Sequence, residues 1–253
     1  QSVVSNKFVY FGEYWYDNGG LPSILVNYLK THELNIFEYL DKDKFLKVSS
    51  DDFKNPTALT TINQNVLMCQ TGYLTLRSDL NKTSTVALGI PNGEIYKALN
   101  RLLANNIFKG NTDITDDYGR SLLEVGTVDD IINLFNSALN SVSYDNYPIV
   151  SESSVQNMLK LYLLGAHQKV LSEVHEAKGR ADLVVNTDNR RIVFEFKYAK
   201  NETEAKSKLL DAVEQIKTRD YGNIVPKKTE LLRIAAVFNA DPKVRAFTEY
   251  QEV

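Results

Sequence analysis

Two stretches in the second half of the chain decide how this sequence folds: residues 179–185, GRADLVV, and residues 192–197, IVFEFK. The first ends in two valines and the second contains β-branched and aromatic residues, and both kinds of residue favour strands. The polar residues 186–190 between them are typical of a hairpin turn. We therefore expect two antiparallel strands joined by this turn.

Side chains alternate along a strand, so Glu195 and Lys197 share one face of the second strand and the aromatic residues share the other. If the hairpin turns near residues 188 and 189, the numbers of opposed residues sum to about 377, which places Asp182 opposite Glu195. Two carboxylates so close repel each other. A divalent cation would hold them together, because Mg²⁺ binds one or two carboxylates and leaves other positions to water and phosphate oxygens. Lys197 would then orient or deprotonate a metal-bound water.

Three further polar residues lie where they could reach this pair. Glu173 is on a strand expected at 169–175, Glu152 is on the apolar stripe of the helix that follows Ser151, and Gln215 flanks the buried face of a helix around 205–216. Each also has an ordinary explanation: a surface charge for Glu173, an acid favoured at a helix start for Glu152, and a solvated helix edge for Gln215.

The order of elements over residues 151–253 is helix, three strands, helix, strand. Ser153 and Gln156 have the spacing of a capping box at the start of the first helix. Residues 231–238 form a continuous apolar run, which predicts a buried fourth strand. This part of the chain is therefore expected to be an α/β domain.

The residues Asp182, Glu195 and Lys197 in GRADLVV and FEFK have the spacing D-x12-E-x-K. With the order of elements, this resembles the signature of the PD-(D/E)XK nuclease superfamily, although Ala181 stands where that name expects proline. The resemblance implies a restriction-endonuclease-like αβββαβ core and a phosphodiesterase that uses Mg²⁺ or Mn²⁺. It further implies that Asp182 and Glu195 are metal ligands, that Lys197 is catalytic and that Glu173 assists them at the metal.

Residues 172–173, and residues 212–216 followed by Tyr221, are more narrowly similar to the nuclease domain at the C-terminus of bacterial AAA-ATPase-like proteins. Residues 14–15, 70–75 and 90–94 resemble the end of the ATPase-like region of that family. A phosphate loop of the form G-x-x-x-x-G-K-[ST] does not occur in this sequence, so we expect no nucleotide site in this chain.

Residues 1–148 are expected to form a mainly helical accessory region, and residues 149–253 the nuclease domain. Within the first region, a helix at 60–70, strands at 73–76 and 85–88, and a helix after Gly93 have the order of a winged helix. A small helical subdomain with a hairpin is the alternative.

Composition excludes several classes of protein. The 253 residues contain one cysteine and three histidines, too few for a disulfide framework or a structural Cys/His zinc site. No apolar run approaches the ~20 residues of a membrane span, and no signal peptide is apparent, so we expect a cytoplasmic protein without membrane contact. The net charge is −3, with +2 on residues 151–253 and −5 on residues 1–150, which argues against coating of nucleic acid by bulk charge. The chain begins with Gln1 and is expected to be a fragment of a longer protein.

The sequence thus predicts hydrolysis of phosphodiesters in DNA, with RNA the less favoured substrate, and a homodimer would allow both strands to be cut. Arg180 is expected to contact a substrate phosphate or to cap a turn, and Gln215 to hold a phosphate or the lysine. The alternative is a catalytically silent nucleic-acid-binding or protein-coupling module of an AAA-ATPase-like protein. The intact Asp, Glu and Lys set argues against that alternative.

Overall fold

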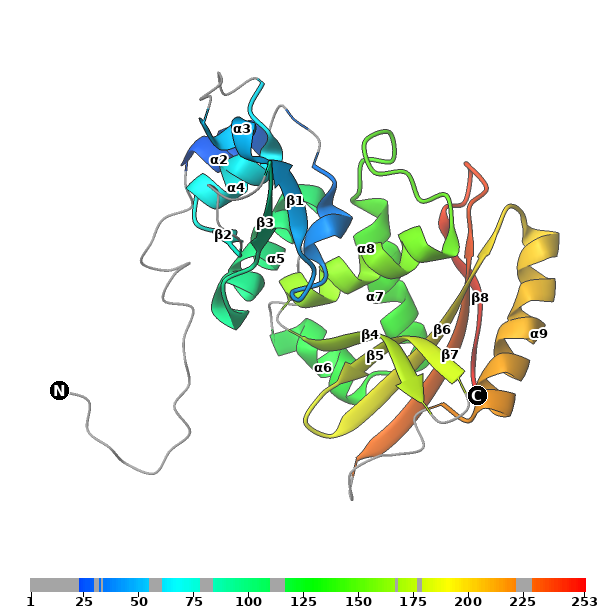
Figure 1. Ribbon diagram of the computed structural model, residues 1–253. Helices are drawn as coiled ribbons and strands as arrows, with labels where there is room; N and C mark the ends of the chain where they lie inside the picture. The colour runs from blue at the N-terminus through cyan, green and yellow to red at the C-terminus, as the bar shows by residue number, and fades with distance from the viewer. Residues whose placement is uncertain are drawn as a thin grey trace, which may run out of the picture. The chain divides into compact units, whose positions relative to one another are not determined.

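A computed structural model of the chain is shown in Figure 1. It describes residues 23–29, 32, 34–54, 61–77, 84–109, 117–166, 168–176, 179–221 and 229–253. The chain divides into two compact units, Gln1–Leu99 and Asn100–Val253, and helix α5 (Gly93–Ile107) runs through the division. The division expected between residues 148 and 149 remains a prediction about the nuclease domain. Within the described ranges, the helices are all too short or too polar to cross a membrane.

The first unit contains a small antiparallel sheet in the order β1-β3-β2. Its elements are α2 (Ser23–Leu29), η1 (Ile36–Tyr39), β1 (Leu46–Ser49), α3 (Ser50–Lys54), α4 (Gln64–Gln70), β2 (Thr75–Leu76), β3 (Thr85–Gly89) and the first turns of α5. The two predicted strands are present as β2 and β3, and β1 was not predicted. Helix α4 begins later than expected because the Asn63 side chain accepts a hydrogen bond from the Asn65 N–H and caps it. Residues 14–15 lie outside the described residues.

The second unit contains a five-stranded sheet in the order β4-β5-β6-β7-β8 (Figure 1). The strands are β4 (Lys169–Glu176), β5 (Gly179–Asn186), β6 (Arg190–Ala199), β7 (Glu230–Asn239) and β8 (Ala246–Glu252), and the helices after α5 are α6 (Asp117–Val125), α7 (Val128–Asn140), α8 (Glu152–Gly165) and α9 (Glu202–Arg219). The predicted order of helix, three strands, helix and strand is confirmed as α8, β4, β5, β6, α9 and β7. Strand β8 and the parallel pairing of β6 with β7 were not predicted.

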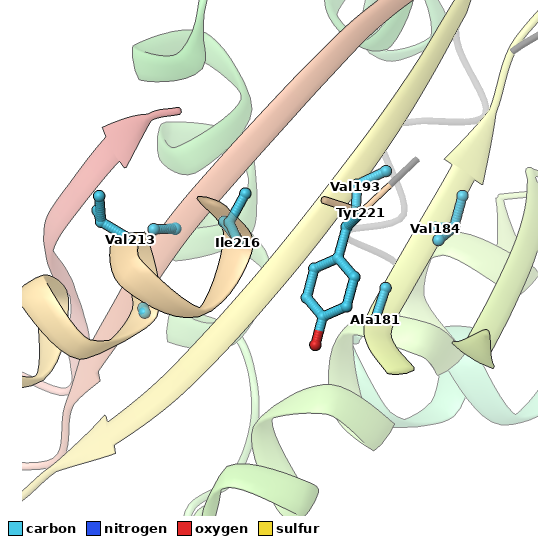
Figure 2. Close-up of a cluster of buried hydrophobic side chains, with 8 residues drawn as sticks. Ala181, Val184, Val193, Val213, Ile216 and Tyr221 are labelled. Carbon is cyan, nitrogen blue, oxygen red and sulfur yellow. The ribbon is translucent and has the colours of Figure 1, made fainter. Parts of the chain in front are cut away.

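Helix α9 packs on one face of this sheet through small and branched residues. Ala212, Val213 and Ile216 of the helix lie in one buried cluster with Val193 of β6 and Ala235 of β7. Figure 2 shows members of this cluster from α9, β5 and β6. Because Glu195 and Lys197 follow Val193 at alternate positions on β6, the strand itself places them on the α9 side of the sheet.

The opposite face of β6 is aromatic. The rings of Phe194 and Phe196 are stacked with centroids 5.4 Å apart, and Phe135 of α7 and Phe247 of β8 lie against them. Helix α7 is also tied to β8, since the Asn136 side chain exchanges two hydrogen bonds with the backbone of Phe247. This packing explains why α7 belongs to the second unit, and it holds β6 in place on its aromatic face.

Helix α8 begins differently from the prediction. Ser151 is the N-cap, and its capping box is completed by Ser154, so the box expected from Ser153 and Gln156 is wrong. The Ser154 hydroxyl accepts from the Val150 and Ser151 N–H groups, and this short side chain replaces the longer Glu or Gln usual at that position. Gln156 is therefore not used for capping.

Gly165 gives a direct test of packing in the second unit, and Gly93 of the first unit serves as its control. A Cβ atom on Gly165 of α8 would collide with the Cβ of Ala104 in α5, whereas a Cβ on Gly93 would have nothing within 4 Å. We expect Gly165→Ala to lower the free energy of unfolding by roughly 1–3 kcal/mol, because overpacked cores are destabilised by such amounts. Gly93→Ala is the control and should be neutral or slightly stabilising. Equal stability of the two variants in urea titrations would contradict this account.

Candidate active site

The two carboxylates are brought together where β5 separates from β6. The two strands pair from Asn186 with Arg191 to Leu183 with Phe194, which is the predicted register, and the pairing ends there. Beyond it the Phe196 N–H donates to Asp182 Oδ2 at 2.8 Å. The Asp182 side chain thus takes a backbone donor of β6 at the point of separation, and this bond holds its carboxylate beside Glu195.

Glu195 is completely buried. Its Oε1 accepts a hydrogen bond from Lys197 Nζ at 2.7 Å, while Oε2 is buried and has no hydrogen-bond partner among the described residues. A buried carboxylate oxygen without a partner is costly, and such an atom in a native protein calls for a ligand, an ion or a proton. Lys197 therefore holds Oε1 of this carboxylate in place, and Oε2 can accept a hydrogen bond or bind a cation.

The surroundings favour the neutral forms of both acids. Burial raises the pKa of Asp182 to about 6, against the opposing effects of the Phe196 N–H and the Lys197 charge. Burial, followed by the negative charge of Asp182, raises the pKa of Glu195 to about 7. The charge of Asp182 thus disfavours ionisation of Glu195, as expected for two carboxylates that share one site. A bound cation would reverse this preference.

Lys197 links this pair to helix α8. Its Nζ lies 3.7 Å from Oε1 of Glu152, at the first residue of the helix. Burial lowers the pKa of Lys197, but the hydrogen bond and charge of Glu195, and then the charges of Glu152 and Asp182, raise it overall. The lysine therefore stays protonated. With all three acids ionised, the group carries a formal charge of −2, which one divalent cation would balance.

Sequence reasoning missed Gln156. Its side chain is hydrogen-bonded to Asp182 and lowers the pKa of that carboxyl. Gln156 follows Glu152 by four residues, so both side chains lie on the same face of α8. The helical spacing could have identified it, but its assignment to a capping box concealed it.

The structure does not bring all predicted residues to the same place. Gln215 donates to the Tyr221 hydroxyl at 3.3 Å rather than to Lys197. Arg180 lies on β5, two residues before Asp182, with an exposed side chain. Glu173 lies on β4 between residues paired with Ala181 and Leu183, and its side chain is outside the described part of the structure. The roles predicted for these three residues remain predictions.

Asp182 and Glu195 are the described side chains best suited to hold a metal ion. Both offer oxygen ligands, Oε2 of Glu195 has no described hydrogen-bond partner, and Mg²⁺ needs no more than one or two carboxylates besides water and phosphate. A group of three or more Asp, Glu, His or Cys side chains placed to hold a metal is not found among the described residues. The chemistry of the donor set therefore fits Mg²⁺ or Mn²⁺ bound mainly by these two acids.

A pocket of about 470 Å³ lies elsewhere on the second unit, at Arg190. Arg190 is the first residue of β6, so it is about 23 Å along the strand from Lys197 at ~3.3 Å per residue. Its guanidinium is bound by Glu230 and by the Gly126 carbonyl. The lining of this pocket includes neither carboxylate of the candidate site, and its arginine has a structural role.

Residues 150–248 match the family model of the PD-(D/E)XK nuclease superfamily. The match runs from the residue before the α8 cap into β8, includes Asp182, Glu195 and Lys197, and covers less than half of the chain. A search of curated proteins gave no match. The PD-(D/E)XK match supports the resemblance seen in the sequence, while the association with AAA-ATPase-like proteins remains a prediction.

The raised pKa values predict how the free energy of unfolding of the metal-free chain depends on pH. Because the folded chain holds protons on Asp182 and Glu195 that the unfolded chain has released, stability should fall as pH rises from about 4 to 7. Asp182→Asn keeps an acceptor for the Phe196 N–H and removes one charge. We expect it to be more stable than wild type at pH 8 by roughly 1–3 kcal/mol and equal to it at pH 4.

Urea titrations in EDTA at both pH values would measure this difference. Glu214→Gln is the matched control, since Glu214 is an exposed acid on α9. It should follow wild type at both pH values. A wild-type chain as stable as Asp182→Asn at pH 8 would show that ionisation of Asp182 costs the folded chain nothing.

Proposed function

We propose that this chain is a metal-dependent nuclease that hydrolyses phosphodiester bonds in DNA. The observation that carries the proposal is the buried Glu195 with one oxygen lacking a described partner, beside Asp182 and in contact with Lys197. These three residues lie within the region that matches the PD-(D/E)XK nuclease superfamily. Members of that superfamily are generally nucleases, so the match and the arrangement of charges support the same chemistry.

In this proposal, Asp182 and Glu195 hold a Mg²⁺ or Mn²⁺ ion, with Glu173 as a third ligand. The bound metal supplies a Lewis acid that polarises the phosphate and lowers the pKa of the attacking water. The Phe196 N–H fixes one oxygen of Asp182, and Lys197 fixes one oxygen of Glu195. Glu195 therefore has one oxygen held by Lys197 and one without a described partner, while Asp182 is held by the Phe196 N–H and by Gln156.

Lys197 acts in this proposal as a cation that positions water and offsets charge on the phosphate. Glu195 and Glu152 hold its ammonium group from two sides, and both raise its pKa. Catalysis benefits when such a group is oriented before the reaction begins. Arg180 and Gln215 are assigned to substrate contact, and Glu152 acts through the lysine.

The proposal also covers the two parts of the chain and the larger protein to which they belong. Helices and strands α8 to β7 form the αβββαβ core of the nuclease domain, residues 149–253. The first unit is assigned to a winged helix, and the order α4, β2, β3 and α5 with the β1-β3-β2 sheet supports this assignment. The proposed setting is an AAA-ATPase-like protein of the bacterial cytoplasm, with DNA rather than RNA as substrate and with a homodimer to reach both strands.

The alternative function is a silent module that binds nucleic acid or couples to an ATPase without turnover. It predicts that the carboxylate pair has no affinity for metal ions. The two functions therefore differ in a property that can be measured without substrate.

A cleavage assay tests the proposed function directly. Wild type, incubated with supercoiled plasmid and with branched and single-stranded oligonucleotides, should cut in Mg²⁺ or Mn²⁺ and not in EDTA. We expect Lys197→Ala and Asp182→Asn each to lower the rate at least about 100-fold, since each removes an electrostatic contact to the reacting groups. Lys206→Met is the control, because Lys206 is exposed and ion-paired with Glu202. Metal-dependent cutting that survives Lys197→Ala would place the activity elsewhere.

A thermal-shift titration separates the nuclease from the silent module. Mg²⁺ or Mn²⁺ should raise Tm at pH 8, because an ion that binds only the folded chain stabilises it by RT ln(1 + [L]/Kd), or about 2.7 kcal/mol at 100 times Kd. The shift should vanish in Asp182→Asn and persist in Glu214→Gln. A flat titration of wild type up to millimolar metal would favour the silent module.

A further inference from the structure

A second polar cluster lies at the end of helix α9, beyond the carboxylate pair. It consists of Gln215, Arg219 and Tyr221, together with Gly179 of β5, and we refer to it as the Arg219 cluster. The Tyr221 hydroxyl accepts hydrogen bonds from Arg219 Nη1 at 2.9 Å and from Gln215 Nε2 at 3.3 Å. Two side chains from the C-terminal part of α9 therefore donate to the same hydroxyl group.

Tyr221 is rigidly placed. Its side chain is fully buried in the cluster that includes Ala181, Val184 and Val193, and Figure 2 shows these three residues beside its ring. Ala181 is the residue before Asp182. The aromatic ring thus fills the space between α9 and β5, and its hydroxyl provides a fixed anchor for the exposed Arg219.

Gly179 allows the stem of Arg219 to approach β5. A Cβ atom at residue 179 would lie 2.5 Å from Cδ and 3.2 Å from Cγ of Arg219. Real Cβ atoms do not tolerate the shorter distance, so any other residue would push the arginine away. The arginine stem therefore lies across the start of β5, three residues before Asp182.

The negative charges of the candidate site affect the pKa of Arg219. The hydrogen bond to Tyr221 raises the pKa of Arg219, burial opposes it, and the charges of Glu195 and Asp182 raise it further. An arginine in the last turn of a helix also has a simple structural explanation, since cations there interact favourably with the helix dipole. Lys217 lies in the same turn and satisfies that explanation as well. The contacts of Arg219 with Tyr221 and Gly179 are additional to it. The dipole alone does not account for the cluster.

We propose that Arg219 binds a backbone phosphate of the nucleic acid that enters the carboxylate site. The inference rests on the proposed nuclease function and adds to it a substrate-binding residue. A guanidinium has five N–H donors, of which Tyr221 accepts one, and its planar group suits two phosphate oxygens at once. Tyr221 and Gly179 act as positioning residues, since the first anchors the guanidinium and the second admits its stem.

Salt-dependent binding tests this assignment. We would measure fluorescence anisotropy of a labelled DNA oligonucleotide with the full chain carrying Asp182→Asn, in EDTA, over a range of NaCl concentrations. Adding Arg219→Met should weaken binding about 5- to 20-fold and reduce the slope of log K against log[NaCl] by about 0.7–0.9, the value for one lost phosphate contact. Lys217→Met removes the same charge from the same helical turn and should leave the slope unchanged.

Two further variants distinguish positioning from charge. Arg219→Lys should keep most of the slope but bind less tightly, because a lysine does not reproduce the planar double contact. Gly179→Ala leaves the arginine in the sequence and displaces its stem, so it should weaken binding in the same direction as Arg219→Met. Normal binding by Gly179→Ala, with the chain folded as judged by its Tm, would overturn the positioning role.

The outcomes separate this inference from the function on which it rests. If the Asp182→Asn parent does not bind the DNA, the proposed function and the inference are both overturned. If the parent binds and Arg219→Met binds equally well with the same slope, only the inference is overturned. Equal losses of stability in Arg219→Met and Lys217→Met, with no change in binding, would assign Arg219 to the helix dipole alone.

Discussion

The hydrogen bond from the Phe196 N–H to Asp182 is the interaction on which the candidate site depends. Where β5 leaves β6, a backbone donor of the central strand loses its strand partner, and the Asp182 carboxylate replaces it. An unsatisfied buried N–H would be costly, so the bond fixes Asp182 in place. The same bond holds a second negative charge beside the fully buried Glu195. One hydrogen bond thus satisfies the Phe196 N–H and also keeps the Asp182 carboxylate close enough to Glu195 to repel its negative charge.

The two faces of β6 differ in what they carry: one packs in the core, and the other bears charged residues of the candidate site. One face carries Phe194 and Phe196 in an aromatic layer with α7 and β8, where ring packing adds to apolar burial. The other face carries Glu195 and Lys197, whose burial disfavours their charged forms. A strand that is well packed on one side can hold such groups in fixed positions on the other. The raised pKa values of both acids reflect that arrangement.

Two helices complete the site from their ends. The first two turns of α8 bring Glu152 to Lys197 and Gln156 to Asp182, and the last turn of α9 brings Arg219 to the start of β5. Helix α8 can do this because Ser151 and Ser154 satisfy its own free N–H groups, which leaves Gln156 for Asp182. Each helix end thus adds polar groups around the carboxylates. The strands supply the two carboxylates and the lysine of the candidate site, and the helices supply polar groups around them.

The sequence by itself determined the hairpin register, the face shared by Glu195 and Lys197, and the order from α8 to β7, because alternation and turn chemistry are local properties of the chain. It did not determine the parallel pairing of β6 with β7, the added strand β8 or the contact between Gly179 and Arg219. The Gly179–Arg219 contact joins residues forty positions apart, and no local periodicity encodes the distance between them. Only the tertiary structure decided that Gln156 serves Asp182 rather than a helix cap, since the choice between two hydrogen-bond partners depends on which lies closer once the sheet has formed.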